Sequence, residues 1–193
     1  MIKVGFKRGT FAVLDAAGQV VPDKVFIIEG KPGKGGMVEA SISGISPDSI
    51  KVYASNTAYF VSAKGTGDVK ADIDILDIPQ EMQEAVLGRK KHADGFTLIG
   101  EDTDPPYVAG ILESEDASGQ PVLYSLLRGK FSAGDESFKT NEDKPGEPES
   151  EKLTMDCTAN DDGQTIAYGI GTELASKLRA YAFPGYTPEV PAP

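Results

Sequence analysis

The chain has 193 residues and carries 19 Lys and Arg against 30 Asp and Glu, a formal net charge of −11. This length suits one domain with a hydrophobic core, and the acidic balance argues against a nucleic-acid-binding protein because phosphate would be repelled. A single cysteine, Cys157, and a single histidine, His92, exclude an intrachain disulfide framework, a CxxC zinc site and a multi-histidine metal centre. The apolar runs are too short to span a bilayer and no targeting segment is visible, so we expect a soluble protein made in a reducing cytoplasm.

The first part of the chain is typical of short strands separated by turns. The clearest strand is Val69–Ile75, where apolar residues at every second position alternate with Lys70, Asp72 and Asp74. This period of two predicts a half-buried antiparallel strand with one face open to water. Earlier strands are expected at Phe11–Leu14, Val25–Ile28, Val38–Ser43, Ile50–Tyr53 and Ala58–Val61.

The period changes between Pro79 and Gly88, which indicates a short helix. Pro79 suits the first helical position, Asp77 lies in capping range, and Gly88 is a stop signal followed by basic residues. The apolar residues expected to pack on the sheet are Met82, Val86 and Leu87.

The second part of the chain returns to strands and ends in a helix. A hairpin-type turn is expected at Asn160–Gly163, and Thr172–Tyr181 is expected to form a short helix with Thr172 as its cap. The sequence thus predicts a mainly β scaffold with one flanking helix, a short C-terminal helix and long loops. The expected strands are Phe96–Ile99, Val108–Leu112, Val122–Phe131, Leu153–Thr158 and Ile166–Ile170.

Two segments do not fit the strand pattern. The segment 139–152 contains no large apolar residue, so we expect a long polar loop that leaves the β scaffold and is functional or disordered. The segment 183–193 is rich in proline, and we expect an extended, mobile tail. One β domain is therefore predicted over residues 1–182.

The candidate chemical motifs are all weak. Gly30–Gly36 is rich in glycine, but no Gly-Lys pair is followed by Ser or Thr, so a phosphate loop is not expected. Glu101–Asp104 lacks the spacing of a calcium loop and favours a solvated acidic turn, and Asp72 and Asp74 fit the wet face of a strand. Cys157 favours a structural thiol. The residues predict no enzyme, no cofactor and no metal, and a scaffold suited to binding or assembly.

Six blocks of sequence carry a resemblance to a known family. They are Val4–Gly9, Lys51–Asn56, Lys64–Val69, Ile99–Thr103, Leu112–Asp116 and Gly129–Ser132. In their order and spacing, with one helix after Leu76–Pro79, they resemble the major tail tube protein of long-tailed, non-contractile phages, in the form common among phages and prophages of Gram-positive bacteria. The resemblance runs from Val4 to about Ala182.

The resemblance implies a β-sandwich or small barrel flanked by a helix. Six copies would form a ring, and rings would stack into a hollow tube through which DNA leaves the capsid without being bound specifically. The resemblance implies a structural protein of the virion tail, made in the host cytoplasm. Its partners would be further copies of itself, the tail tip or initiator, the tape measure protein and the tail terminator, with no cofactor and no membrane.

Roles for individual residues follow from the resemblance. Asp72 and Asp74 would suit an acidic lumen in which DNA slides without sticking. Tyr53, Tyr59 and Phe60 are candidate interface anchors, with ordinary core packing as an equal alternative. The polar loop supplies candidates for contact with a neighbouring subunit or the next ring, namely Asn141, Glu142, Asp143, Glu147, Glu149 and Glu151.

Two alternatives remain open at the level of sequence. A related tube of a bacterial contractile or secretion device would share the ring-forming fold. A monomeric β-sandwich that binds a carbohydrate or a host surface would present aromatic side chains on a concave face, and the absence of Trp counts mildly against it. The tail at 183–193 is either a bare terminus or a former linker to a decoration domain.

Overall fold

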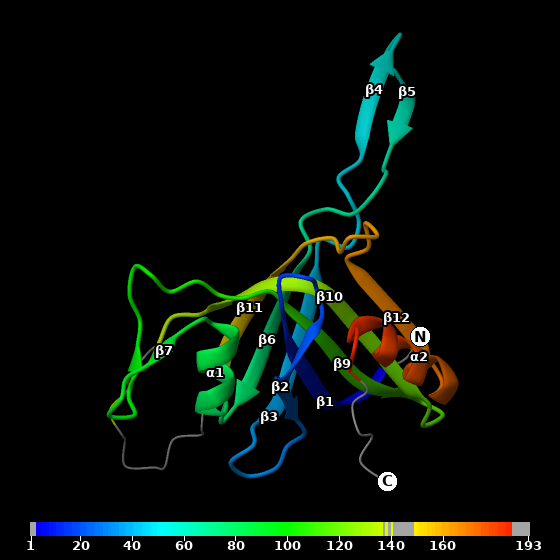
Figure 1. Ribbon diagram of the computed structural model, residues 1–193. Coiled ribbons are helices and arrows are strands. Elements are labelled where there is room, and N and C mark those ends of the chain that lie inside the picture. Colours follow the sequence, from blue (N-terminus) through cyan, green and yellow to red (C-terminus); the bar gives the residue numbers. More distant parts are fainter. Residues whose placement is uncertain (1–2, 137, 139, 141–148, 187–193) are drawn as a thin grey trace.

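A single curled antiparallel sheet forms the body of the protein (Figure 1). The computed structural model describes residues 3–136, 138, 140 and 149–186. Met37 of β3 packs against Gly9 of β1, so the strand at one end of the sheet order approaches the strand next to the other end, without pairing over the described residues. The fold is mainly β and sandwich-like, with two helices and no closed barrel in this part of the chain, as the sequence predicts apart from the barrel alternative. The strand order is β2 (Val20–Ile28), β1 (Lys3–Leu14), β9 (Val108–Asp116), β10 (Pro121–Ala133), β11 (Glu151–Cys157), β6 (Lys70–Leu76) and β3 (Gly36–Ser43), and β12 (Ile166–Ile170) also pairs with β10.

Strand β10 belongs to both halves of this sheet. Its first part, Val122–Leu126, pairs with β12, and its second part, Gly129–Ala133, pairs with β11. The other edge of β10 pairs with β9 from Pro121 to Gly129, and the register of this pairing shifts between Leu126 and Gly129. Irregularities of this kind bend a strand and increase its twist, which lets one sheet fold over onto itself.

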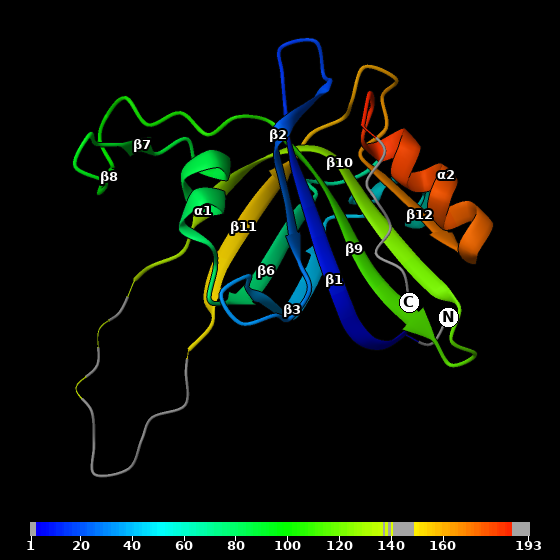
Figure 2. The same ribbon diagram turned by 60° about the horizontal axis from the view of Figure 1, so that its bottom comes forward.

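The main core fills the inside of the curl. Phe11 and Phe131 meet edge to face there, with ring centroids 5.6 Å apart and an interplanar angle of 80°. Helix α1 (Gln80–Val86) closes one end of the curl (Figure 2). Two residues of α1, Met82 and Val86, pack into this core as predicted, and so does Leu87, which follows the helix directly.

A second core lies on the outside of the sheet, under helix α2 (Thr172–Ala182). Ile111 and Leu123 of the sheet meet Ala175 of the helix and Phe183 just beyond it. Helix α2 contacts β9, β10 and β12. The outer surface of the sheet is therefore covered over one half and open to solvent over β11, β6, β3 and the end of β10.

Strand β6 confirms the alternation seen in the sequence, because Ala71, Ile73 and Ile75 are fully buried and the residues between them face out. The turn after Asn160 is also confirmed, since its side-chain Oδ1 accepts the backbone N–H groups of Asp162 and Gln164. Four shorter strands complete the fold: β4 (Ile50–Ala54) pairs with β5 (Thr57–Ser62), and β7 (Lys90–Lys91) pairs with β8 (Thr97–Leu98).

Both predicted helix caps are wrong. Asp77 has a φ of 53° and its Oδ2 accepts the Gly33 N–H at 3.0 Å, so it ties down a loop and caps no helix. Pro79 is the N-cap residue of α1 and has no side-chain cap. In α2 the N-cap is Gly171, with a φ of 96°, a conformation that glycine adopts most easily, and Thr172 is the first helical residue.

We expect Phe131→Ala to lower the free energy of unfolding by about 3–5 kcal/mol, because it leaves a cavity beside Phe11 in the main core. Tyr59→Ala is the control, since this side chain is 81% exposed and its loss should change stability by less than about 1 kcal/mol. Chemical denaturation followed by circular dichroism measures both. Equal effects of the two substitutions would contradict the assignment of the core.

Candidate assembly surfaces

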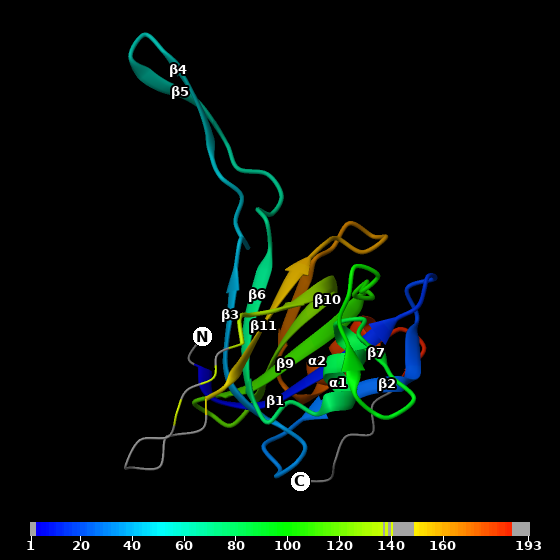
Figure 3. The ribbon, with the colours of Figure 1, turned by 90° about the vertical axis from the view of Figure 1, so that its left-hand side faces the viewer.

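The β4–β5 hairpin stands away from the body of the protein (Figures 1 and 3). Ser55 and Asn56 both have positive φ angles, 50° and 62°, as a two-residue hairpin turn requires. Tyr53, Tyr59 and Phe60 are 65%, 81% and 55% exposed. Successive residues of a strand point to opposite faces, so Tyr59 and Phe60 make both faces of the hairpin apolar. An isolated two-stranded hairpin is marginal in water, and exposed apolar surface of this kind marks a contact site.

The root of this hairpin is fixed to the body at one point. Gly67 donates its backbone N–H to the carbonyl oxygen of Gly44 at 2.9 Å. Gly44 has a φ of 70°, and a Cβ there would lie 1.9 Å from the Asp68 carbonyl oxygen, so no other residue fits. We call this contact between Gly44 and Gly67 the clamp. The segments 45–49 and 63–66 connect the clamp to the hairpin, and in the described part of the chain no backbone hydrogen bond joins these two segments to each other.

Two strand edges that bound the uncovered half of the sheet are unpaired in the described residues. β3 lies at one end of the sheet order, and the second part of β10, after Gly129, pairs with β11 alone. The other terminal strand, β2, carries Pro22, Asp23 and Lys24, and proline and charge at an edge discourage pairing with another chain. β3 has no proline, so its edge is the less protected one.

The uncovered half of the sheet forms a broad polar surface, which we call the open face. It is made by the outward residues of β3, β6, β11 and the end of β10, in three rows across the strands. Asp72 and Asp74 both lie on it, but so do Lys70, Lys130 and Lys152. The expected acidic surface is therefore a mixed one. The rows are Ser43, Lys70, Asp156 and Lys130; Ser41, Asp72, Thr154 and Ser132; and Glu39, Asp74 and Lys152.

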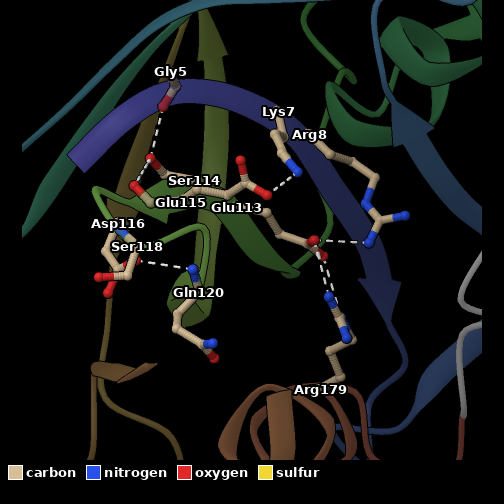
Figure 4. A network of polar contacts seen from close by, with 10 residues as sticks. All are labelled: Gly5, Lys7, Arg8, Glu113, Ser114, Glu115, Asp116, Ser118, Gln120 and Arg179. Carbon is tan, nitrogen blue, oxygen red and sulfur yellow. Dashed lines mark hydrogen bonds and ion pairs between the residues drawn. The ribbon is translucent and has the colours of Figure 1, made fainter. Parts of the chain in front are cut away.

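A largely buried polar network joins α2 to the sheet (Figure 4). Glu113 of β9 accepts from Arg8 of β1 at 2.7 Å and from the Nη2 of Arg179 of α2 at 2.9 Å. These three side chains are only 10–15% exposed. Lys7 pairs with Glu115 at the edge of the same network. Removing Glu113 would leave two guanidinium groups without their partner, so the network fixes how α2 lies on the strands.

The comparison with protein families decides the identity. A family described as phage tail tube protein matches residues 1–183, almost the whole chain. The chain belongs to this family. It is therefore a structural component of a phage tail tube, which assembles with itself and other tail proteins, and this structural role points away from catalysis.

Three further findings accompany the family membership. No curated protein matches the chain. In the described residues neither helix is long and apolar enough to cross a membrane. The same part of the chain holds no group of three or more His, Cys, Asp or Glu side chains that could bind a metal ion.

The residues predicted to make contacts in a tail tube lie in separate places. Tyr53, Tyr59 and Phe60 come together on the hairpin, so these three are not core residues of the protomer. Glu149 is exposed, whereas Glu151, at the start of β11, accepts from the side-chain amide of Gln83 on α1. Burial, followed by repulsion from Glu136, raises the pKa of Glu151. Four other predicted contact residues lie outside the described residues: Asn141, Glu142, Asp143 and Glu147.

Sequence reasoning missed the Arg8–Glu113–Arg179 network and the position of Lys130 and Lys152 beside Asp72 on the open face. A signal for the network was present, since Glu113 follows a run of apolar residues in its strand and stays buried. Its two partners are 105 and 66 residues away in the sequence, so no local pattern could have named them.

Cys157 provides a test of the buried surface of β11. Burial, with a smaller contribution from the nearby Asp156 charge, raises the pKa of this thiol to about 11. The thiolate is the reactive form, and it is scarce below the pKa. At pH 8 we expect alkylation by iodoacetamide to be about 100-fold slower in the native protein than in the unfolded chain. The rate should rise steadily with pH up to about 11, and equal rates in native and unfolded protein would contradict this burial.

Proposed function

We propose that this protein forms hexameric rings that stack into the hollow tail tube of a long-tailed, non-contractile phage, and that DNA leaves the capsid through this tube. The observation that carries the proposal is the β4–β5 hairpin, which offers three large exposed aromatic side chains on an arm that its own protomer does not cover. Such an arm gains stability only when another molecule covers it.

The two unpaired edges support closure into a ring. β3, β6, β11 and β10 are successive antiparallel neighbours, so β3 and β10 run in opposite directions. The β3 edge of one copy would therefore pair antiparallel with the β10 edge of the next, and the same contact would repeat around the ring. Closure would pair both of these edges, so neither stays exposed. The number six is taken from the resemblance to known tail tube proteins.

In this arrangement the open face would line the lumen and α2 would lie on the outside. The tail tip or initiator, the tape measure protein and the tail terminator are the expected partners, and the virion of a phage of a Gram-positive host is the expected location.

A tube of a bacterial contractile or secretion device is a second candidate with the same surfaces. A monomeric carbohydrate-binding module is disfavoured, because the exposed aromatic side chains project on an arm instead of lining a concave face.

The hairpin is tested by replacing Tyr53, Tyr59 and Phe60 together with Ser. We expect a folded protomer whose free energy of unfolding changes by less than about 1 kcal/mol, because these side chains are exposed. We also expect no rings or tubes in negative-stain electron microscopy over a concentration series with added tail-tip initiator, under conditions in which the wild type assembles.

The matched control is Leu174→Ser with Tyr181→Ser, which removes exposed apolar groups from α2. This control should assemble normally. Tubes of normal length from the triple hairpin variant would contradict the proposed role of the hairpin, and a strictly monomeric wild type with initiator present would contradict tube formation itself.

The polar loop is tested by deleting residues 141–150. Its ends are held by the pairing of Ala133 with Leu153 and by the Gly134 N–H, which donates to the Lys152 carbonyl oxygen at 2.9 Å. The shortened protein should therefore fold, because shortening a loop between fixed ends changes stability little. We expect impaired ring or tube formation by electron microscopy. A Gly/Ser replacement of equal length separates loss of the acidic side chains from loss of length, and normal tubes from both variants would reject a contact role for the loop.

A further inference from the structure

The open face carries three lysines on a strongly acidic chain, and their arrangement has a consequence for DNA. If this face lines the lumen, as proposed above, Lys70, Lys130 and Lys152 would point at passing phosphates. A lysine that neutralises a phosphate releases counterions, and each such contact strengthens binding to duplex DNA. Free lysines on this surface would therefore slow the movement of DNA.

Each of these three lysines has a carboxylate partner. Lys70 Nζ lies 2.9 Å from Asp156 Oδ1, and Lys152 Nζ lies 3.4 Å from Asp72 Oδ2. Lys130 Nζ lies 2.9 Å from Asp104 Oδ1, just before β9. The Lys70–Asp156 and Lys152–Asp72 pairs join the neighbouring strands β6 and β11, and residues 70 and 156 are direct partners in their ladder.

The carboxylate of Asp72 is itself held in place. Thr154 donates its hydroxyl to Asp72 Oδ1 at 2.6 Å, which leaves Oδ2 directed at Lys152. This hydrogen bond, with a smaller contribution from Lys152, lowers the pKa of Asp72, and the hydrogen bond that Lys70 donates to Asp156 raises the pKa of Lys70. Both kinds of partner therefore stay charged through the neutral range. The two remaining carboxylates, Glu39 and Asp74, form no ion pair with a described residue, so the surface keeps a slight negative excess.

We infer that Asp72, Asp156 and Asp104 act as neutralising partners that withhold the lysines of the open face from the phosphates of duplex DNA. The surface is thus a latent DNA-binding site, kept inactive by ion pairs within the sheet. Exposed ion pairs of this kind contribute little to stability, so the carboxylates can be removed without unfolding the protein. The inference rests on the proposed tail tube function.

The test replaces Asp72 and Asp156 with Asn, which keeps the size of each side chain and frees Lys152 and Lys70. Binding to a fluorescent DNA duplex is measured by anisotropy at 50–200 mM salt, at concentrations where light scattering gives the mass of one protomer. We expect no binding by the wild type. The variant should bind measurably, at least about ten-fold tighter than the detection limit that bounds the wild type, with a logarithmic salt slope of about −2 for two freed lysines.

Two controls separate this effect from net charge. Asp23→Asn with Glu81→Gln makes the same change in net charge at exposed positions outside the open face, and it should not bind. Adding Lys70→Gln and Lys152→Gln to the Asn variant should abolish the gained binding. A gain that persists in this fourfold variant, or an equal gain in the control, would overturn the inference.

Electron microscopy of the same samples keeps the two proposals distinguishable. If the Asn variant forms normal tubes but its protomers gain no affinity for DNA, the inference fails while the tube proposal stands. If wild type and variants form no tubes with initiator present, the tube proposal fails whatever the DNA measurement gives. Wild-type protomers that bind duplex DNA through Lys70 and Lys152 would also overturn the inference.

Discussion

The bend of β10 between Leu126 and Gly129 is the constraint on which the rest of the structure depends. Because β12 and β11 take successive parts of one β10 edge, the sheet continues around the bend and its two halves enclose the main core. The same bend divides the outer surface. One half receives α2 and a second core, and the other half is left to solvent. The covered and open surfaces of the protomer are therefore consequences of how a single strand pairs.

The polar groups of the protein divide in a similar way. Glu113 and its two arginines are nearly buried and hold α2 in one orientation, where loss of one partner is expensive. The ion pairs of the open face are exposed and contribute little to stability. Their effect lies in the charge pattern that they present to another molecule. Similar pairs of side chains thus have different roles, and burial decides which.

Much of the scaffold could be predicted from the sequence, because local patterns determine it. The alternation of apolar and polar residues around Ile73 predicted a strand with the correct buried face. The start signal at Pro79 and the stop signal at Gly88 predicted a helix with the correct apolar residues. The cap predicted at Asp77 failed, because the carboxylate of Asp77 binds the backbone of Gly33, 44 residues away. Pairings over such distances, such as β1 with β9, follow from packing of the whole chain and leave no local signal.

The candidate site was predictable in part for the same reason. Tyr53, Tyr59 and Phe60 could be recognised as unusual, but an apolar strand without alternation fits a core as well as a contact surface. Only the fold separates the two. For the open face, the two aspartates on β6 were visible in one strand, whereas Lys130 and Lys152 come from other strands and join them only through the register of the sheet.

The single clamp at the root of the hairpin has a mechanical consequence. Beyond the Gly67–Gly44 bond, two irregular segments connect the body of the protein to the hairpin, so a change in the angle of the arm would break neither ladder. If the protein assembles into stacked rings as proposed, and if such arms join them, the arms on the outer side of a curve would extend while those on the inner side would fold back. A tube built in this way can bend while each ring keeps its shape, and its flexibility would reside in a few residues around Gly44 and Gly67.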